Sequence, residues 1–158
     1  FMIRECSGIV CVCIEPEQAK RMNLPMMVEH NTSVYGTAFT ISIDAAKGVT
    51  TGVSAPDRVK AIKAVINPNG NPEDLASPGH MFPLVAKKGG VLERDGHTEA
   101  SVDLARLAGF APAGILCELC APDGLMAKLP RVTTFAMEHD LTCLSIEDLI
   151  AYRKEKNI

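Results

Sequence analysis

Gly8-Ile9-Val10-Cys11-Val12-Cys13-Ile14 is an apolar run, rich in β-branched residues, near the start of a chain of 158 residues. Its composition and length predict a strand over residues 8–14. Residues 113–119 have the same character and predict a second strand. Shorter apolar stretches predict further strands at 38–43, 82–87 and 141–144.

Helices are predicted between these strands, without strict alternation. Their periodic apolar residues place them at 16–22, 55–66, 98–108, 131–138 and 146–155. Two helix starts carry a capping pattern, because Ser54 and Ser145 each stand three residues ahead of an aspartate. Clusters of Asn, Pro and Gly predict a surface loop over residues 67–81.

The composition excludes several classes of protein. With 47% hydrophobic and 22% charged residues, the chain fits one globular domain with a sizeable core. A net charge of -3 and the lack of a long Lys/Arg block argue against nucleic acid held by bulk electrostatics. No apolar run approaches membrane-spanning length, and the first residues lack the basic-then-apolar pattern of a secretory signal. We therefore expect a soluble, cytoplasmic protein with no nucleic-acid or membrane partner.

The chain contains six cysteines, Cys6, Cys11, Cys13, Cys117, Cys120 and Cys143. Most are predicted to be core thiols, because a free cysteine within an apolar strand packs as a small hydrophobic side chain. The alternative is a zinc site that joins the pair Cys11 and Cys13 to the pair Cys117 and Cys120. A secreted disulfide framework is disfavoured by the length and apolar character of the chain.

The segment Arg94-Asp95-Gly96-His97-Thr98-Glu99 combines a cation, a turn glycine, an imidazole and a hydroxyl at a predicted helix start. Free backbone N–H groups and the positive end of the helix dipole favour an anion at such a place. Arg94 and Thr98 would hold a phosphate or carboxylate, with His97 above it. The alternative is an ordinary tight turn capped by the threonine.

Two loops hold further polar groups. Residues 48–54 place threonines and glycines before a helix, and Pro78-Gly79-His80 holds an imidazole in a rigid loop. Loops carry function more often than core strands do. In the alternative interpretation the threonines only shape turns, and His80 only bonds a neighbouring carbonyl group.

Six ordered blocks carry a resemblance that covers nearly the whole chain. They are Ser7-Gly8-Ile9-Val10-Cys11, Leu24-Pro25-Met26-Met27-Val28, residues 48–58, residues 78–84, Gly96-His97-Thr98-Glu99 and residues 112–119. Together they resemble the signature blocks of 3,4-dihydroxy-2-butanone 4-phosphate synthase, an enzyme family of riboflavin biosynthesis. The resemblance implies an α+β domain with a mixed sheet and surrounding helices, acting as a homodimer with active sites near the subunit interface.

The reaction of that family converts D-ribulose 5-phosphate into L-3,4-dihydroxy-2-butanone 4-phosphate and formate with a divalent metal, Mg²⁺ or Mn²⁺. By this resemblance the substrate-binding residues would be Arg94, Asp95, Gly96, His97 and Thr98. His97 would also be a metal ligand, while His80 and Glu118 would be the essential acid–base pair. Cys11 matches a cysteine that lines the family's pocket. Thr51 is added because its hydroxyl suits a phosphate anchor.

The chemistry of that reaction calls for residues of these types. Removal of a proton next to a ketone produces an enediolate, so the site needs a base near its working pH and an electrophile for the oxyanion. The imidazole of His80 titrates near neutrality, and burial can raise the pKa of a carboxyl group such as Glu118. A divalent ion that bridges two substrate oxygens would supply the electrophile.

The expected metal site is where the sequence departs from the family. Mg²⁺ prefers oxygen ligands, so His97 alone would hold it poorly. In the family a carboxylate comes from an acidic segment upstream of the first helix, and this sequence contains no such segment. Residues 1–6 also resemble the last turns of a helix without its beginning. We therefore expect residues 1–158 to be one synthase domain that lacks its N-terminal segment.

Two other hypotheses stay open at this point. The chain could be a non-catalytic module that binds an anion or zinc, which predicts tight binding without turnover. It could also be one half of a bifunctional enzyme fused to a GTP cyclohydrolase II domain, although no residue indicates a fusion.

Overall fold

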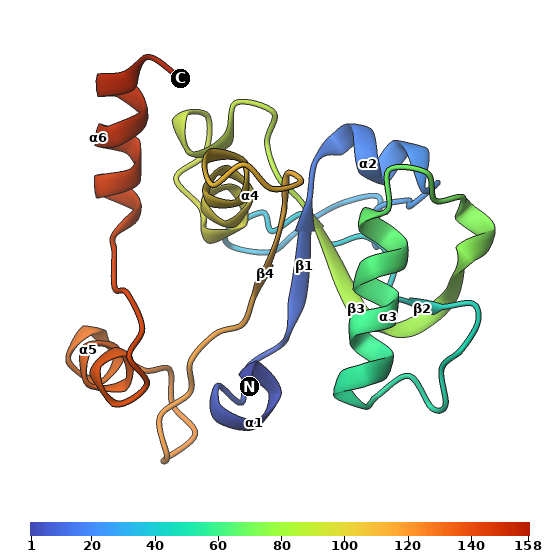
Figure 1. The fold of residues 1–158 in the computed structure, drawn as a ribbon, viewed down its shortest axis with the longest axis horizontal. Coiled ribbons are helices and arrows are strands. Elements are labelled where there is room, and N and C mark those ends of the chain that lie inside the picture. The colour runs from blue at the N-terminus through green and yellow to red at the C-terminus, as the bar shows by residue number, and fades with distance from the viewer.

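A four-stranded sheet lies at the centre of the molecule (Figure 1). In the computed structural model, which describes residues 1–158, the strands are β1 (Cys11–Ile14), β2 (Ile43–Ala45), β3 (Leu75–Val85) and β4 (Ala113–Leu116). Their order is β2-β3-β1-β4, with β1 parallel to β3 and antiparallel to β4, while β2 is antiparallel to β3. The sheet is therefore mixed and the fold is α+β, as expected.

Helices surround this sheet. They are α1 (Met2–Glu5), α2 (Pro16–Arg21), α3 (Ala55–Ile66), α4 (His97–Leu107), α5 (Leu129–Glu138) and α6 (Ile146–Lys156), with short 3-10 turns η1 (Pro72–Asp74) and η2 (Gly90–Leu92). All five predicted helices are present. Both capping predictions are confirmed, because the Ser54 and Ser145 hydroxyls accept hydrogen bonds from the backbone N–H groups of Asp57 and Asp148.

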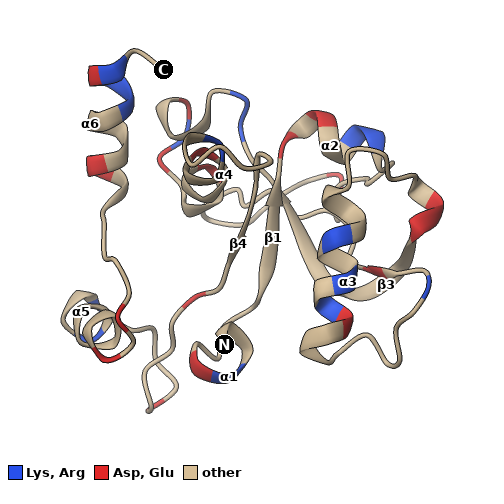
Figure 2. Cartoon of the chain, in the orientation of Figure 1, with Lys and Arg blue, Asp and Glu red and all other residues tan.

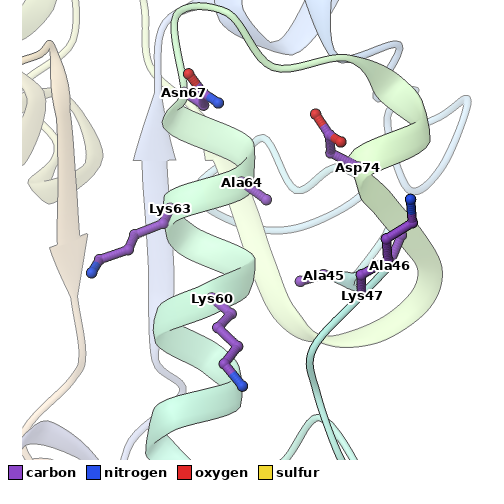
Figure 3. Close-up of a pocket in the computed structure, with 8 residues that line it drawn as sticks. All are labelled: Ala45, Ala46, Lys47, Lys60, Lys63, Ala64, Asn67 and Asp74. Atoms are coloured by element: carbon purple, nitrogen blue, oxygen red, sulfur yellow. The ribbon is translucent and has the colours of Figure 1, made fainter.

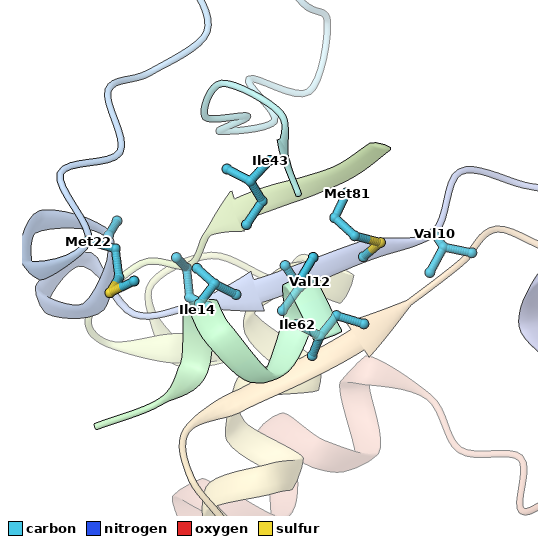
Figure 4. Packing of buried hydrophobic residues seen from close by; sticks show 10 residues of the cluster. Val10, Val12, Ile14, Met22, Ile43, Ile62 and Met81 are labelled. Carbon is cyan, nitrogen blue, oxygen red and sulfur yellow. The ribbon is translucent and has the colours of Figure 1, made fainter. Parts of the chain in front are cut away.

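Two apolar clusters cover opposite faces of β1. Side chains alternate between faces along a strand, so Val12 and Ile14 point one way and Cys11 and Cys13 the other. The first face packs against α3 (Figure 4), in a cluster formed by Val10, Val12, Ile14, Ala19, Met22, Ile43, Ala61, Ile62, Val65 and Met81. The second face packs against Val102 of α4. Coverage on both faces explains why the run 8–14 contains no polar residue.

The strand boundaries differ from the sequence-based predictions. β1 starts at Cys11 rather than at residue 8, because the Ile9 amide donates its hydrogen bond to a side chain instead of a strand. The predicted strand over 38–43 is not formed. Phe39 and Thr40 each make only an isolated β-bridge, and β2 begins at Ile43. The strand predicted at 141–144 is wrong, since these residues connect α5 to α6 and pair with no strand.

The predicted surface loop at 67–81 is also wrong in its second half. β3 already begins at Leu75, where it pairs with β2 in the register Ala45↔Leu75 and Asp44↔Ala76. This pairing outweighs the local tendency of Pro and Gly to break a strand. Gly79 permits it, because a Cβ there would overlap the backbone of Ile43.

The basic residues are distributed over several elements of the fold. Lys and Arg residues are spread over α2, α3 and α6 and lie among Asp and Glu (Figure 2). None of the helices combines the length and the apolar character that crossing a membrane requires.

Candidate active site

The strand pairing places two of the predicted site residues near the N-terminal end of β1, one on each side of it. Cys11 of β1 is in register with Phe82 on β3 and with Leu116 on β4. His80 lies on β3 two residues before Phe82, and Glu118 follows Leu116 by two residues and is bound to the backbone of Ile9, which precedes β1.

Glu118 follows β4 and is tied to the start of β1. Its Oε2 accepts a hydrogen bond from the Ile9 backbone N–H at 2.9 Å. Gly8 allows this approach, because a Cβ at that position would overlap the Glu118 carbonyl oxygen. The carboxylate is therefore held in place although its residue is exposed to solvent.

Cys11 lies close to Glu118 as a neutral thiol. Burial, and after it the negative charges of Glu118 and of nearby thiols, raise the pKa of Cys11 to about 12. The Cys11 Sγ lies 3.4 Å from the Ile9 carbonyl oxygen, to which it donates a weak hydrogen bond. A thiol with so high a pKa is a poor nucleophile at neutral pH, so Cys11 is suited to lining the site.

His80 is paired with the carboxylate of Asp44, which no sequence motif indicates. The Asp44 Oδ2 lies 2.8 Å from the ring Nδ1 of His80, and the Asp44 Oδ1 accepts the backbone N–H of His80 at 3.0 Å. His80 is two residues before Phe82, which packs with the α4 cluster, so its side chain is on the α4 side of the sheet. The alternative in which His80 only bonds a carbonyl group is therefore wrong.

The loop of residues 48–54 closes over this pair. Gly52 has a φ of +83°, and a Cβ there would lie 2.6 Å from the His80 Nδ1. The loop is anchored by Asp57, whose Oδ2 accepts hydrogen bonds from the Thr50 hydroxyl at 2.7 Å and from the Gly52 N–H at 3.2 Å. Hydrogen bonding, led by Thr50, lowers the pKa of Asp57 below its ordinary value. Thr50 therefore shapes the loop, while Thr51 is exposed beside it.

Arg94 is held by a buried carboxylate. The Arg94 Nη1 donates to Glu99 Oε2 at 2.6 Å, and its Nη2 donates to the Tyr35 carbonyl oxygen at 3.2 Å. Glu99 is only 1% exposed and also accepts the Lys87 backbone N–H at 2.9 Å. Gly96 makes room for this arrangement, because a Cβ there would overlap the guanidinium of Arg94.

A second buried carboxylate, one turn further along α4, fixes the neighbouring loop. Asp103 accepts the Val91 backbone N–H at 2.9 Å, Arg106 Nη1 at 2.8 Å and Arg153 Nη1 at 2.7 Å. The segment between β3 and α4 is therefore tied to α4 at both ends. Arg94 stands at the end of that segment, so its position is set before any ligand arrives.

The remaining predicted residues form the start of α4. The helix begins at His97 with Gly96 as its N-cap and without a side-chain cap, so the interpretation of Thr98 as a cap is wrong. Thr98 is buried, whereas Asp95 and His97 are exposed. α4 packs on β4 and β1, which puts its first turn on the same side of the sheet as His80.

The residues of this chain do not by themselves fit a metal site. No three His, Cys, Asp or Glu side chains are grouped so that they could hold a metal ion. His97 supplies one imidazole nitrogen, and Mg²⁺ requires several oxygen ligands. The zinc hypothesis is likewise unsupported, although Cys6, Cys11 and Cys13 are buried thiols as predicted; Cys143 is exposed instead.

A cavity of about 370 Å³ lies elsewhere on the surface, between α3, β2 and η1 (Figure 3). Its lining residues are Ala45, Ala46, Lys47, Lys60, Lys63, Ala64, Asn67 and Asp74. None of them is a predicted site residue, and the Lys60 ammonium group already bonds the Gly48 carbonyl. The candidate active site is therefore the more open region around His80 and Glu118.

The chain is similar to known enzymes along its whole length. Residues 1–152 match the protein family described as 3,4-dihydroxy-2-butanone 4-phosphate synthase. A protein of that name from Nitratidesulfovibrio vulgaris (strain Hildenborough) is 62% identical over 158 residues, which cover 100% of this chain and 74% of the relative. One from Shewanella pealeana is 60% identical over 153 residues, covering 97% of this chain and 72% of the relative.

Solved structures agree with this match. A 3,4-dihydroxy-2-butanone 4-phosphate synthase in complex with two magnesium ions is 38% identical with a TM-score of 0.93, covering 99% of this chain and 78% of that one. A two-domain synthase from A. baumannii is 44% identical with a TM-score of 0.92, and this chain spans only 45% of its length. These relatives are enzymes, so the hypothesis of a non-catalytic module is wrong. The chain belongs to the 3,4-dihydroxy-2-butanone 4-phosphate synthase family.

Proposed function

We propose that this chain converts D-ribulose 5-phosphate into L-3,4-dihydroxy-2-butanone 4-phosphate and formate, as a step of riboflavin biosynthesis. The observation that carries the proposal is the placement of His80 and Glu118 near the N-terminal end of β1, on its two sides, in a chain of this family. Residues 1–158 act as one synthase domain. Six free cysteines suit the reducing conditions of the cytoplasm, where we place the enzyme.

In this proposal His80 and Glu118 transfer the protons. Removal of a proton next to the ketone gives an enediolate, and the later loss of water and of formate needs protons moved at defined places. The His80 ring is half-exposed and held by Asp44, while the Glu118 carboxylate is held by the Ile9 amide. Cys11 stays protonated and lines the space between them.

The phosphate of the substrate is anchored near the start of α4. Arg94 keeps guanidinium N–H groups that neither Glu99 nor Tyr35 uses, and the first turn of α4 offers free backbone N–H groups. Asp95, Gly96 and Thr98 complete this region. We add the exposed hydroxyl of Thr51, which extends from the loop over His80.

A divalent metal, Mg²⁺ or Mn²⁺, is part of the proposal, with His97 as one of its ligands. The support is the exposed imidazole at the start of α4 and the relative that was solved with two magnesium ions. The other ligands are oxygen donors that the single chain does not gather beside His97.

We also propose a homodimer. Large apolar side chains are left exposed on the single chain, among them Val34, Tyr35, Phe110 and Met137. Tyr35 belongs to the segment whose backbone contacts Arg94, so a partner seated there would lie beside the substrate site.

The full-length protein that contains this chain is expected to release formate from D-ribulose 5-phosphate. Formate release should stop in EDTA and return when Mg²⁺ or Mn²⁺ is added in excess. The measurement is a coupled formate assay, with D-ribose 5-phosphate as the control substrate. A full-length, folded protein that releases no formate in the presence of either metal would overturn the proposed function.

Arg94→Ala is expected to raise KM for the substrate by about 10- to 100-fold, because a charge-assisted hydrogen bond to the phosphate is worth about 1.5–3 kcal/mol. Loss of Arg94 also leaves the buried Glu99 without its cation, so ligand-induced thermal shifts are read against the melting temperature of each variant. Arg94→Lys keeps that positive charge, and Arg131→Ala, which removes an arginine of α5 that is likewise paired with a glutamate, is the control. Equal phosphate-induced shifts in wild type and Arg94→Ala would remove Arg94 from this role.

A further inference from the structure

We propose that Asp44 is a positioning residue that keeps the Nδ1 of His80 protonated, so that Nε2 is the ring atom that accepts the substrate's proton. The inference rests on the function proposed above, in which His80 moves a proton. Its structural part, the state of the ring, can be measured without any turnover.

The two contacts of Asp44 determine the state of the ring. An ionised carboxylate only accepts hydrogen bonds, so the ring nitrogen that faces it must carry a hydrogen. That nitrogen is Nδ1, which lies 2.8 Å from the Asp44 Oδ2. The second oxygen, Oδ1, accepts the backbone N–H of His80 at 3.0 Å. In the neutral ring Nε2 is therefore left without a hydrogen and is free to act as a base.

The surrounding strands hold this pair in place. Asp44 is 14% exposed in its side chain, whereas the His80 side chain is 46% exposed, so the pair is covered on the Asp44 side and open on the other. Next to Asp44, the fully buried Ile43 is in register with Met81, which fixes β2 against β3. The carboxylate therefore reaches His80 from a rigid position.

Gly52 covers the hydrogen bond between the two side chains. A Cβ at Gly52 would overlap the Asp44 Oδ2 and would lie 2.6 Å from the His80 Nδ1, so this loop packs directly against the hydrogen bond between them. The Gly52 N–H donates a hydrogen bond to Asp57, which keeps the loop from moving away. The ring is thus held with Nδ1 inward and Nε2 outward.

Asp44→Asn is the sharpest test because the change is isosteric. The backbone N–H of His80 needs an acceptor, and the asparagine side chain has one oxygen, so that oxygen faces the backbone. Its NH₂ group then faces Nδ1 and can only donate, which moves the ring hydrogen to Nε2 and blocks that atom as a base. We expect kcat to fall by about 100-fold or more, with KM changed by less than about threefold.

The state of the ring is read by ¹⁵N NMR of histidine-labelled protein at about pH 8, where an ordinary histidine is neutral. His80 is assigned by the signals that disappear in His80→Ala. We expect the Nδ1–H form in wild type and the Nε2–H form in Asp44→Asn. The control is Asp74→Asn, since Asp74 also accepts a backbone N–H, from Asn71, but does not contact His80.

The double variant tests whether Asp44 acts through His80. If it does, Asp44→Asn adds no further loss of kcat in a His80→Ala background. An Nε2–H ring in wild type, an unchanged ring in Asp44→Asn, or a full additional loss in the double variant would each overturn the proposal. A wild-type enzyme that shows the Nδ1–H ring yet releases no formate would overturn the proposed function and leave the pairing of Asp44 with His80 intact.

Discussion

Glu118→Gln is expected to lower kcat by about 10²- to 10⁴-fold, the usual contribution of a general acid or base. The amide has the size of the carboxyl group and keeps an oxygen that can accept the Ile9 N–H, so β1 and β4 stay joined. What is lost is the ability to take up and release a proton. We therefore expect the free energy of unfolding to change by less than about 0.5 kcal/mol, as for a surface substitution.

The pKa of the neighbouring Cys11 thiol provides a second measurement on Glu118→Gln. Burial is the first cause of the high pKa of Cys11, and the charge of Glu118 adds to it. The pKa of Cys11 should therefore fall from about 12 in Glu118→Gln but stay above its ordinary value, which the pH dependence of thiol alkylation measures. Glu138→Gln, which removes an exposed carboxylate on α5, is the control. Near-native turnover of Glu118→Gln would contradict the catalytic role.

His80→Ala should likewise remove most activity, with a loss of kcat of about 10²- to 10⁴-fold. The His80 backbone N–H remains available to Asp44, and the ring is half-exposed, so its removal leaves no buried cavity. Steady-state kinetics should therefore show the loss of kcat, while urea unfolding should show an unchanged free energy of unfolding.

The control for this variant is His139→Ala. His139 packs its ring against Phe135, at 4.4 Å between ring centroids, on the helix α5. That substitution is expected to affect stability and to leave kcat near the wild-type value. Free imidazole should restore part of the activity of His80→Ala by occupying the vacated space. If His80→Ala turned over at close to the native rate, another group would have to move the proton.

The helices could be predicted well from the chain because their signals are local. Ser54 before α3 and Ser145 before α6 mark starts that the structure confirms, since each hydroxyl bonds an amide only three residues away. Strands were harder to predict, because a strand exists only where a partner pairs with it. Residues 75–81 have the composition of a loop, yet they form part of β3 because they pair with β2. Residues 141–144 have the composition of a strand, yet they pair with no other strand.

In the candidate site too, local features could be predicted from the sequence, whereas contacts between distant segments could not. Arg94 and His97 stand in one short segment whose residue types suggest an anion site, and the ordered blocks around them resemble a known family. Asp44 could not be found in this way, because 36 residues separate it from His80. Glu99 stands in the same segment, residues 94–99, but its buried contact with Arg94 forms only when α4 is folded against the loop before it.

The order of residues along the chain alone therefore specifies the helices, the apolar strands β1 and β4, the family, and the residue types available for chemistry. These depend on contacts within a few residues or on composition, which a linear sequence records directly. The register of the sheet, which brings His80 and Glu118 near the N-terminal end of β1, and the carboxylates that hold His80 and Arg94 come only from the folded structure. Pairing across distant segments is decided by the combined burial and hydrogen bonding of the whole domain, and no local pattern records it.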